Sequence, residues 1–248
     1  MAKTNTPPTP IPVYHYDPDT LEYVGEGVSD ICQIEGTHLL PGYSTPVKPP
    51  AAVAGKVPVF DPAADTWSQV EDHRGAMVYD TATGDSSVID LLGPIPTGKT
   101  TTAPLSFQTW DSNAGAWVDD LPALKKALCA EVEGEAEAAR LRYITGGAGQ
   151  AAVYMTKADQ ADAYKAAGYP ADTTAYPMIA AEVGISGATA QEVADLIIAT
   201  RDGWLTIASQ IEAARLGATG STGTINVAAD RTAAEAAKDT AIAALQAI

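Results

Sequence analysis

Hydrophobic and polar residues follow different periods in the two halves of this chain, and the change falls near "WVDDLPALKK". In residues 1–120, which hold nearly all the prolines, short apolar or aromatic runs alternate with polar turn residues. That pattern is typical of β-hairpins. In residues 121–248, which are rich in alanine, apolar residues recur at steps of three and four, as on one face of an α-helix. The pattern predicts an α+β protein in which small antiparallel β-hairpin modules, joined by Pro-rich linkers, precede an α-helical bundle.

The same pattern suggests four segments along the chain. We expect a disordered N-terminal arm over residues 1–12 and β-hairpin modules with Pro-rich linkers over residues 13–120. A helical bundle over residues 121–217 and a Gly-rich link with a final helix over residues 218–248 complete the chain.

A degenerate repeat in the first half predicts four hairpins. Its copies are "VYHYDPDTLEYVGEG", "VPVFDPAADTWSQVED", "MVYDTATGDSSVIDLLG" and "FQTWDSNAGAWVDD". The first strands end at Tyr16, Phe60, Tyr79 and Trp110, and the return strands start at Tyr23, Trp67, Val88 and Trp117. Between them Asp17, Asp61, Asp80 and Asp111 can form Asx-turns, and Gly84 and Gly115 supply positive φ. A lone hairpin is marginal in water, so these must pack on one another or on a partner.

Proline-rich segments connect the hairpins. "LLPGYSTPVKPPAAVAGK" and "LGPIPTGKTTTAPLSF" predict extended, polyproline-like links with no internal hydrogen bonds. The first half is therefore expected to be a series of small β modules with a limited common core.

The second half predicts five helices. They cover about residues 122–143, 150–167, 174–183, 189–216 and 232–248, with a break at "ITGGAGQ". Thr189 with Glu192, and Thr232 with Glu235, match the T-x-x-E capping box. "GATGSTGTIN" predicts a flexible link that detaches the final helix. That helix ends without a cap, so it either frays or docks on a neighbour.

Charge and composition exclude several classes of partner. The 248 residues carry a net charge of −16, and residues 1–121 hold 5 Lys and Arg against 16 Asp and Glu. Such a surface repels phosphate backbones and anionic membranes, so neither nucleic acid nor membrane is expected as a partner. The N-terminus lacks the apolar core of a signal peptide, and no apolar run approaches the length of a membrane helix. We expect a protein that is made and kept in a reducing cytoplasm, unless it is carried out on a larger particle.

"GPIPTGKTT" spells the nucleotide-binding P-loop through Gly93, Gly98, Lys99 and Thr100. Two prolines inside the loop remove N–H groups that hold phosphate in a true P-loop, and Pro104 stops any following helix. No apolar strand ending in Asp follows to supply a Mg²⁺ ligand. We interpret the match as accidental and expect no cofactor.

No other pattern predicts catalysis or metal binding. Cys32 and Cys129 lack C-x-x-C spacing, and three histidines cannot build a convincing zinc site. His73 lies beside Asp72, but neighbours along a strand point to opposite faces. The turn aspartates lack the D-x-[DN]-x-[DN]-G calcium loop. We therefore predict no catalytic residue, no metal site and no enzyme.

Several phrases resemble the bacteriophage tail fibre assembly family. They are "YHYDPDTLEYVGEG", "WSQVEDHRGAMVYDTATGDSSVIDLLGPIPTGKTTTAP" and "WDSNAGAWVDD", with Asp72 to Gly84 the most specific part. "RYITGGAGQAAVYMTKADQADAY", "YPMIAAEVG" and "VADLIIATRDGW" are similar to a helical region in many such phage proteins. The resemblance implies a chaperone of fibre trimerisation, or a protein that stays attached to the fibre tip. It supplies no catalytic residue, and Lys99 is not part of the family's linker pattern.

The leading hypothesis is a non-enzymatic protein that binds a phage tail fibre or baseplate protein and assists fibre assembly or attachment. Its β modules would contact the partner through edge strands and aromatic residues, and its helices would stabilise the protein or form a homo-oligomer. The candidate contact residues are Tyr16, Tyr23, Phe60, Trp67, Tyr79, Trp110 and Trp117. Two alternatives remain open: a permanent structural subunit of the virion tail, and a module that binds host glycans through its aromatics.

Overall fold

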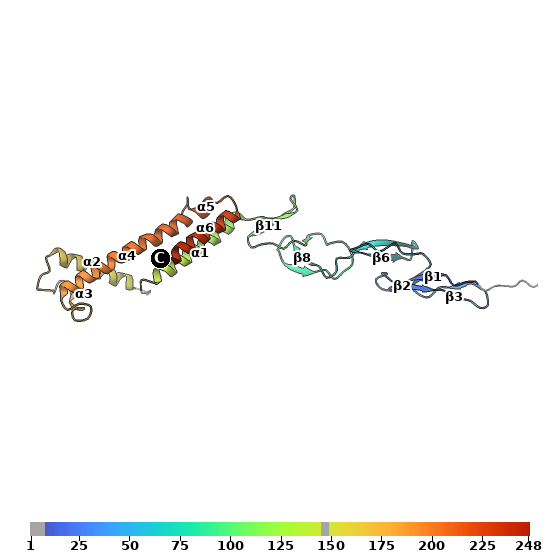
Figure 1. The fold of residues 1–248 in the computed structure, drawn as a ribbon, viewed down its shortest axis with the longest axis horizontal. Helices are drawn as coiled ribbons and strands as arrows, with labels where there is room; N and C mark the ends of the chain where they lie inside the picture. Colours follow the sequence, from blue (N-terminus) through green and yellow to red (C-terminus); the bar gives the residue numbers. More distant parts are fainter. Residues whose placement is uncertain (1–7, 145–148) are drawn as a thin grey trace, which may run out of the picture. The chain divides into compact units, whose positions relative to one another are not determined.

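The computed structural model describes residues 8–144 and 149–248, and it contains two compact units. The β unit comprises the described residues up to 105 and residues 109–118, and the helical unit comprises residues 106–108 and 119–248. Figure 1 colours the strands from blue to green and the helices from green to red. The predicted α+β class is confirmed. Residues 1–7 of the arm expected to be disordered lie outside the described residues, so that expectation stays a prediction.

The β unit consists of short strands in separate small sheets. Two sheets have three strands, in the orders β2-β1-β5 and β10-β8-β9, and the pairs β3-β4, β6-β7 and β11-β12 form two-stranded sheets. The strands are β1 (Pro12–Tyr16), β2 (Tyr23–Val28), β3 (Asp30–Ile31), β4 (His38–Leu39), β5 (Ser44–Thr45), β6 (Lys56–Asp61), β7 (Thr66–Glu71), β8 (Met77–Asp80), β9 (Ser86–Val88), β10 (Lys99–Thr100), β11 (Gln108–Asp111) and β12 (Ala116–Asp119).

All four predicted Asx-turns are confirmed. Each Asp side chain accepts backbone N–H bonds from the residues two and three positions further on, at 2.8–3.2 Å. The residue four positions after the Asp has positive φ in every turn. This residue is Gly84 or Gly115 in two hairpins, as predicted, and Leu21 or Asp65 in the others. One predicted boundary is wrong: the third return strand begins at Ser86, opposite Tyr79, and Val88 is its last residue.

The Pro-rich connectors, which were predicted as extended polyproline-like links, each contain a short strand. The first contains β5, whose Ser44 and Thr45 pair with β1, and the second contains β10, whose Lys99 and Thr100 pair with β8. Each connector therefore supplies the third strand of the sheet that the first or the third predicted hairpin forms. The sequence did not reveal these strands, because each is only two residues long and lies in a proline-rich segment.

The helical unit contains two hydrophobic clusters that share one long helix. Its helices are α1 (Leu121–Leu141), α2 (Gln150–Ala166), α3 (Pro177–Ala180), α4 (Ala190–Thr219), α5 (Thr224–Val227) and α6 (Arg231–Gln246). One cluster packs α1, α5 and α6 against the second half of α4, around Val132, Ile211 and Leu245. The other packs α2 and α3 against the first half of α4, around Ile179 and Val193.

A capping box was predicted at the start of two helices, α4 and α6. The Thr189 hydroxyl accepts the Glu192 N–H at 3.2 Å, and the reciprocal bond from the Glu192 carboxylate is also present, so the first box is confirmed. The second is wrong, because Asp230 caps α6 by accepting the Ala233 N–H at 2.8 Å. Thr232 lies inside the first turn. The predicted helix over residues 174–183 shortens to the single turn of α3, and residues 145–148 of the predicted break lie outside the described residues.

The segment predicted as a flexible Gly-rich link is packed and ordered. It includes the end of α4 and the start of α5, and Ala218 and Ile225 are buried in the first cluster. A Cβ atom on Gly223 would lie 2.4 Å from the Ala218 carbonyl oxygen, so the close approach of the backbone requires glycine here. The final helix is therefore docked rather than detached, and Leu245 is fully buried on it. Among the described residues, no helix is long and apolar enough to cross a membrane.

Candidate partner-binding surface

Four of the predicted contact aromatics pack on one another inside the β unit. Tyr16 lies 4.8 Å from Phe60 between ring centroids, Phe60 lies 5.0 Å from Trp67, and Trp67 lies 5.8 Å from Tyr23. Phe60 is only 4% exposed, whereas the other three are half-buried. These rings join the first hairpin to the second, so most of their area stabilises the unit. Their role in partner binding stays a prediction.

The other three predicted aromatics lie in the third and fourth hairpins. Trp110 and Trp117 meet edge to face across β11 and β12, with ring centroids 5.3 Å apart. Tyr79 stands in the central strand of its sheet, paired with Ser86 on one side and Thr100 on the other. All three are half-buried. They retain exposed area that a partner could contact.

Two tryptophans bind the connectors in the same way. The Trp67 indole N–H donates to the Val47 carbonyl at 2.8 Å, and the Trp117 indole N–H donates to the Thr102 carbonyl at 2.8 Å. In both cases the acceptor lies two residues after the threonine of the connector strand. Each connector is thus held at two neighbouring points, by a strand pair and by an indole.

The threonines themselves repeat the same geometry. The Thr45 hydroxyl accepts the Val47 N–H at 3.2 Å, and the Thr100 hydroxyl accepts the Thr102 N–H at 3.3 Å. The residue before each connector strand has positive φ, at Tyr43 and at Gly98. Residues 12–71 and 77–119 therefore share one organisation, a three-stranded sheet with a hairpin after it, although the first segment also contains the β3-β4 pair.

Arg74 ties the first two hairpins together at "DHRG". Its guanidinium donates to both carboxylate oxygens of Glu22, at 2.8 and 2.9 Å, and to both oxygens of Asp72, at 2.8 Å each. The Arg74 bonds lower the pKa of the Asp72 carboxyl to about 2, and Asp72 and Glu22 raise the pKa of Arg74. The Gly75 N–H bonds to the Ile89 carbonyl at 2.8 Å, which links this node to the third hairpin. The stretch that carries the most specific part of the family resemblance, Asp72 to Gly84, therefore joins the first three predicted hairpins.

The P-loop spelling has a structural explanation. The Lys99 ammonium lies 3.2 Å from the Asp80 carboxylate on the paired strand β8, and the backbone N–H of Gly93 bonds to the Glu71 carbonyl. No helix follows Thr100, because residues 101–107 are turn and irregular structure. Lys99 is therefore committed to an ion pair across the sheet, and this geometry favours the interpretation of a chance match.

A turn at Cys32 is built like the four Asx-turns. The Gly36 N–H bonds to the Cys32 carbonyl at 2.8 Å, and Gly36 has positive φ. The backbone N–H groups of Glu35 and Ile34 point at the sulfur and lower the pKa of the Cys32 thiol. The Cys32 thiol occupies the position that an Asp side chain occupies in the four Asx-turns. The turn is therefore a fifth example of this geometry, and the residue pattern did not reveal it.

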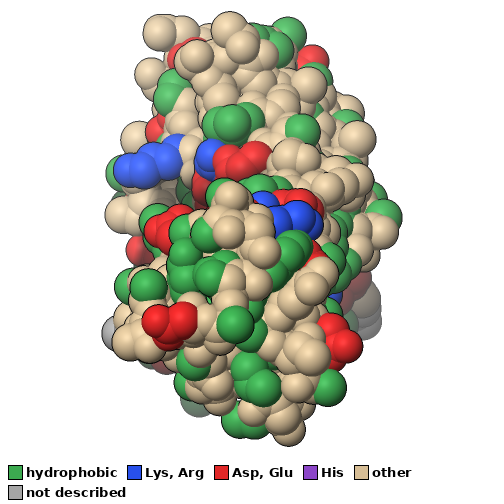
Figure 2. All heavy atoms as spheres, turned by 90° about the vertical axis from the view of Figure 1, so that its left-hand side faces the viewer, with side chains coloured by type: hydrophobic (Ala, Val, Ile, Leu, Met, Phe, Trp, Pro, Cys, Tyr) green, Lys and Arg blue, Asp and Glu red, His purple; other side chains and the backbone are tan. Residues whose placement is uncertain are grey.

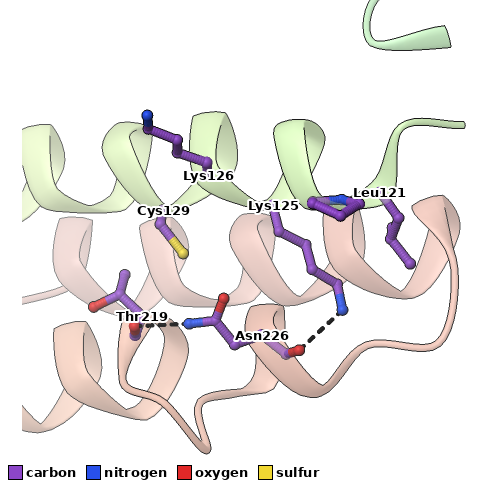
Figure 3. A pocket seen from close by; sticks show the side chains of 7 residues that line it. Leu121, Lys125, Lys126, Cys129, Thr219 and Asn226 are labelled. Atoms are coloured by element: carbon purple, nitrogen blue, oxygen red, sulfur yellow. Dashed lines mark hydrogen bonds between the residues drawn. The ribbon is translucent and has the colours of Figure 1, made fainter. Parts of the chain in front are cut away.

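The helical unit has an open cavity of about 580 Å³ beside α1 and α5 (Figure 3). The residues that line it are Leu121, Pro122, Lys125, Lys126, Cys129, Thr219 and Asn226. Lys125 and Cys129 point toward α5, whereas Lys126 points away. The Lys125 ammonium donates to the Asn226 carbonyl at 2.9 Å, and burial raises the pKa of the Cys129 thiol. The raised pKa keeps the Cys129 thiol protonated at neutral pH, which makes it a weak nucleophile.

Ion pairs cover much of the helical surface. In Figure 2 basic side chains lie next to acidic ones, with hydrophobic side chains dispersed between them. Lys165 pairs with Asp195 at 3.0 Å, and Arg201 pairs with Asp162, which links α2 to α4. Within the described parts of the chain, no three His, Cys, Asp or Glu side chains come together as metal ligands.

Comparison with known proteins gives matches for part of the chain. Residues 6–70 match the family "Tail fiber assembly protein, N-terminal domain". The chain is 41% identical over 127 residues to "Prophage tail fiber assembly protein homolog TfaR" of Escherichia coli K12 and to "Tail fiber assembly protein" of Escherichia phage lambda. Each match covers 51% of this chain, and 64% and 63% of those relatives respectively. "Protein TfaD" of Escherichia coli K12 is 46% identical over 81 residues, which is 32% of this chain and 42% of that protein. No solved structure matches the chain.

Proposed function

We propose that this chain, whose residues 6–70 match the N-terminal domain of the tail fiber assembly family, is a non-enzymatic phage protein that binds a tail fibre and assists the fibre's assembly or attachment. The observation that carries the proposal is the coincidence of the family match with the β unit. Residues 6–70 include the first two hairpins, the aromatic cluster and Glu22, one partner of Arg74.

The organisation of the β unit supports a binding role. The aromatic cluster and the Arg74 ion pairs fix the first two hairpins against each other without a large common core. Large apolar side chains remain exposed on the strands and connectors, including Val24, Val28, Met77 and Leu91. Exposed apolar residues on open sheet edges are typical of interfaces that form by strand addition. A fibre subunit that has not yet assembled presents unpaired strands of its own, which this unit would cover.

The helical unit would stabilise the protein and position copies of it. Its acidic and basic side chains largely pair with each other within the unit, so we place fibre recognition on the β unit. An assembly protein of this kind works in the host cytoplasm. Mass spectrometry of purified particles decides whether it leaves the fibre afterwards, because stoichiometric retention in the virion indicates a role in attachment.

Co-expression tests the proposal. The tail fibre protein of the same phage is produced with the full chain, and separately without it, and soluble fibre is measured. We expect soluble trimeric fibre only in the presence of the chain, and a stable complex of the two proteins. Equal yield and trimerisation without the chain, together with no complex, would contradict the proposed function.

A further inference from the structure

The outer edge of β2 is an open strand edge in the β unit. The Ser29 N–H bonds to the Ile11 carbonyl on the β1 side, and Tyr16 donates its N–H to Tyr43 on the opposite side of β1. The β1–β2 register shifts between His15 and Tyr16, with Val24 as the extra residue on β2. Beyond this bulge hydrogen bonding alternates, so Gly25 and Gly27 face β1, and the N–H and C=O groups of Glu26 and Val28 point away from the sheet.

Nothing in the described residues pairs with that outward row. β6 reaches only the start of the edge, through a bridge between Glu22 and Val59 and a bond from the Phe60 N–H to the Leu21 carbonyl. The sheet order β2-β1-β5 places no other strand of the described chain beyond β2. Unpaired backbone groups along several residues form a template for a further strand.

The side chains on the open edge have a definite pattern. Val24 and Val28 are each 66% exposed, and the exposed Glu26 stands between them on the same face of the strand. On the opposite face His15 covers Gly27, because a Cβ atom on Gly27 would lie 2.7 Å from the Nε2 atom of His15. A strand that added here would therefore contact an apolar, acidic, apolar row.

Other edges of the β unit are shorter or already engaged. β5 and β10 have two residues each, and β9, the counterpart of β2 in residues 77–119, has three. β7 is long, but its Trp67 and Gln69 side chains bond to the carbonyls of Val47 and Ala51 in the connector. β6 has six residues, as β2 does, but its outer edge is engaged by the Glu22–Val59 bridge and by the Phe60 bond to Leu21. β2 therefore offers the most open template among the six-residue strands.

The charge on this edge selects the partner. If two copies of the chain paired antiparallel about the centre of β2, their Glu26 carboxylates would face each other, and like charges directly opposite destabilise a strand pair. The surrounding unit is also strongly acidic. A segment of another protein with a Lys or Arg opposite Glu26, and apolar residues opposite the valines, satisfies both the charge and the pattern.

We propose that β2 is the docking strand of this protein, and that it binds an extended fibre segment with an apolar-basic-apolar alternation by strand addition. The inference rests on the proposed function and names the site and chemistry of fibre recognition. The added strand bonds to the backbone of Glu26 and Val28, its basic side chain pairs with the Glu26 carboxylate, and its apolar side chains contact Val24 and Val28.

Two substitutions at one position test the backbone and the charge separately. Glu26→Pro removes an N–H that faces outward, so it blocks strand addition while leaving the bonds to β1 in place. Glu26→Lys keeps the backbone and reverses the charge. Ser112→Pro is the matched proline control, because the equivalent turn position holds Pro18 and Pro62 in two other hairpins. Glu35→Lys, in an exposed turn, is the matched charge control.

The measurement is the affinity of each full-length variant for the purified fibre protein, together with hydrogen exchange of the wild-type chain. We expect both position-26 variants to bind about tenfold more weakly or worse, the two controls to bind like wild type, and the amides of residues 24–28 to become protected in the complex. Far-UV circular dichroism and thermal unfolding verify that every variant is folded.

Failure of the β2 inference and failure of the proposed function give different results in this experiment. If wild type binds the fibre, and the folded position-26 variants bind within about twofold of it with no protection at residues 24–28, the docking strand is elsewhere and the inference is overturned. If wild type does not bind the fibre at all, the proposed function fails and the inference fails with it.

Discussion

Replacing Leu245 by alanine tests whether the final helix belongs to the bundle core. Leu245 is fully buried on α6 and lies in the cluster that joins α1, α4 and α5. Leu245→Ala removes three carbon atoms, which corresponds to roughly 2.4 kcal/mol of lost burial at about 0.8 kcal/mol per methylene. The cavity left behind adds to this, and buried Leu→Ala changes cost about 2–5 kcal/mol in all. We expect a value in the lower half of this range, about 3 kcal/mol.

The assay is thermal unfolding followed by circular dichroism at 222 nm, which reports on the helices. For a unit of this size about 3 kcal/mol corresponds to a fall in the melting temperature of roughly 10 °C. Leu216→Ala is the matched control, because Leu216 lies on α4 with 51% of its surface exposed. We expect that control to change stability by less than about 0.5 kcal/mol. If both variants melt within a degree or two of wild type, α6 is not part of the core and the packing described above is wrong.

Three further predictions concern the β unit. Because backbone N–H bonds lower the pKa of the Cys32 thiol and burial raises that of Cys129, iodoacetamide should alkylate Cys32 first at neutral pH, and equal rates by mass spectrometry would refute this. Arg74 lowers the pKa of Asp72 to about 2, so the stability from this pair is complete above about pH 4, the ordinary Asp pKa, and is lost as the pH falls toward 2. Urea unfolding followed by tryptophan fluorescence measures the free energy of unfolding of wild type and Arg74→Gln. The difference between the two should become smaller as the pH falls from about 4 toward 2, and a difference that stays constant would contradict this role of Arg74. Calorimetric titration with Mg-ATP should show no binding to wild type or to Lys99→Ala, and saturable binding that requires Lys99 would restore the P-loop interpretation.

Local chemistry made much of the fold predictable. An Asp followed by turn residues and a residue that accepts positive φ specifies the hairpin turn, and all four turns form as expected. Apolar residues at steps of three and four located the long helices within a few residues, and Thr189 with Glu192 fixed the start of α4. In these cases the signal lies within a few neighbouring residues, so no tertiary information is needed.

The errors arose where contacts distant in sequence decided the structure. Two-residue strands such as β5 have no periodicity, and they form because β1 offers an edge to pair with. Thr232 satisfies the capping-box spelling, but Asp230 reaches the first-turn N–H groups two residues earlier. Glycines in the segment after α4 suggested flexibility, whereas Gly223 is required by a close backbone approach and Ile225 is buried beside it.

The candidate site also depends on contacts between segments that are distant in sequence. Packing between the first two hairpins covers most of Tyr16, Phe60 and Trp67, and the predicted role of the hairpin aromatics in partner binding stays a prediction. The open β2 edge could not be located from residue types, because it depends on which strands remain unpaired after folding. One signal was available: the row Val24, Glu26, Val28 alternates with glycines, which is typical of a strand with one exposed face.

The measurement that tests the central claim most directly is the fraction of soluble fibre protein that is trimeric, determined by light scattering after expression with and without this chain. The account predicts that soluble trimer forms only with the chain, that the two proteins co-purify, and that Lys99→Ala supports assembly as well as wild type. Soluble trimer at full yield without the chain, or assembly that depends on Lys99 and ATP, would contradict it.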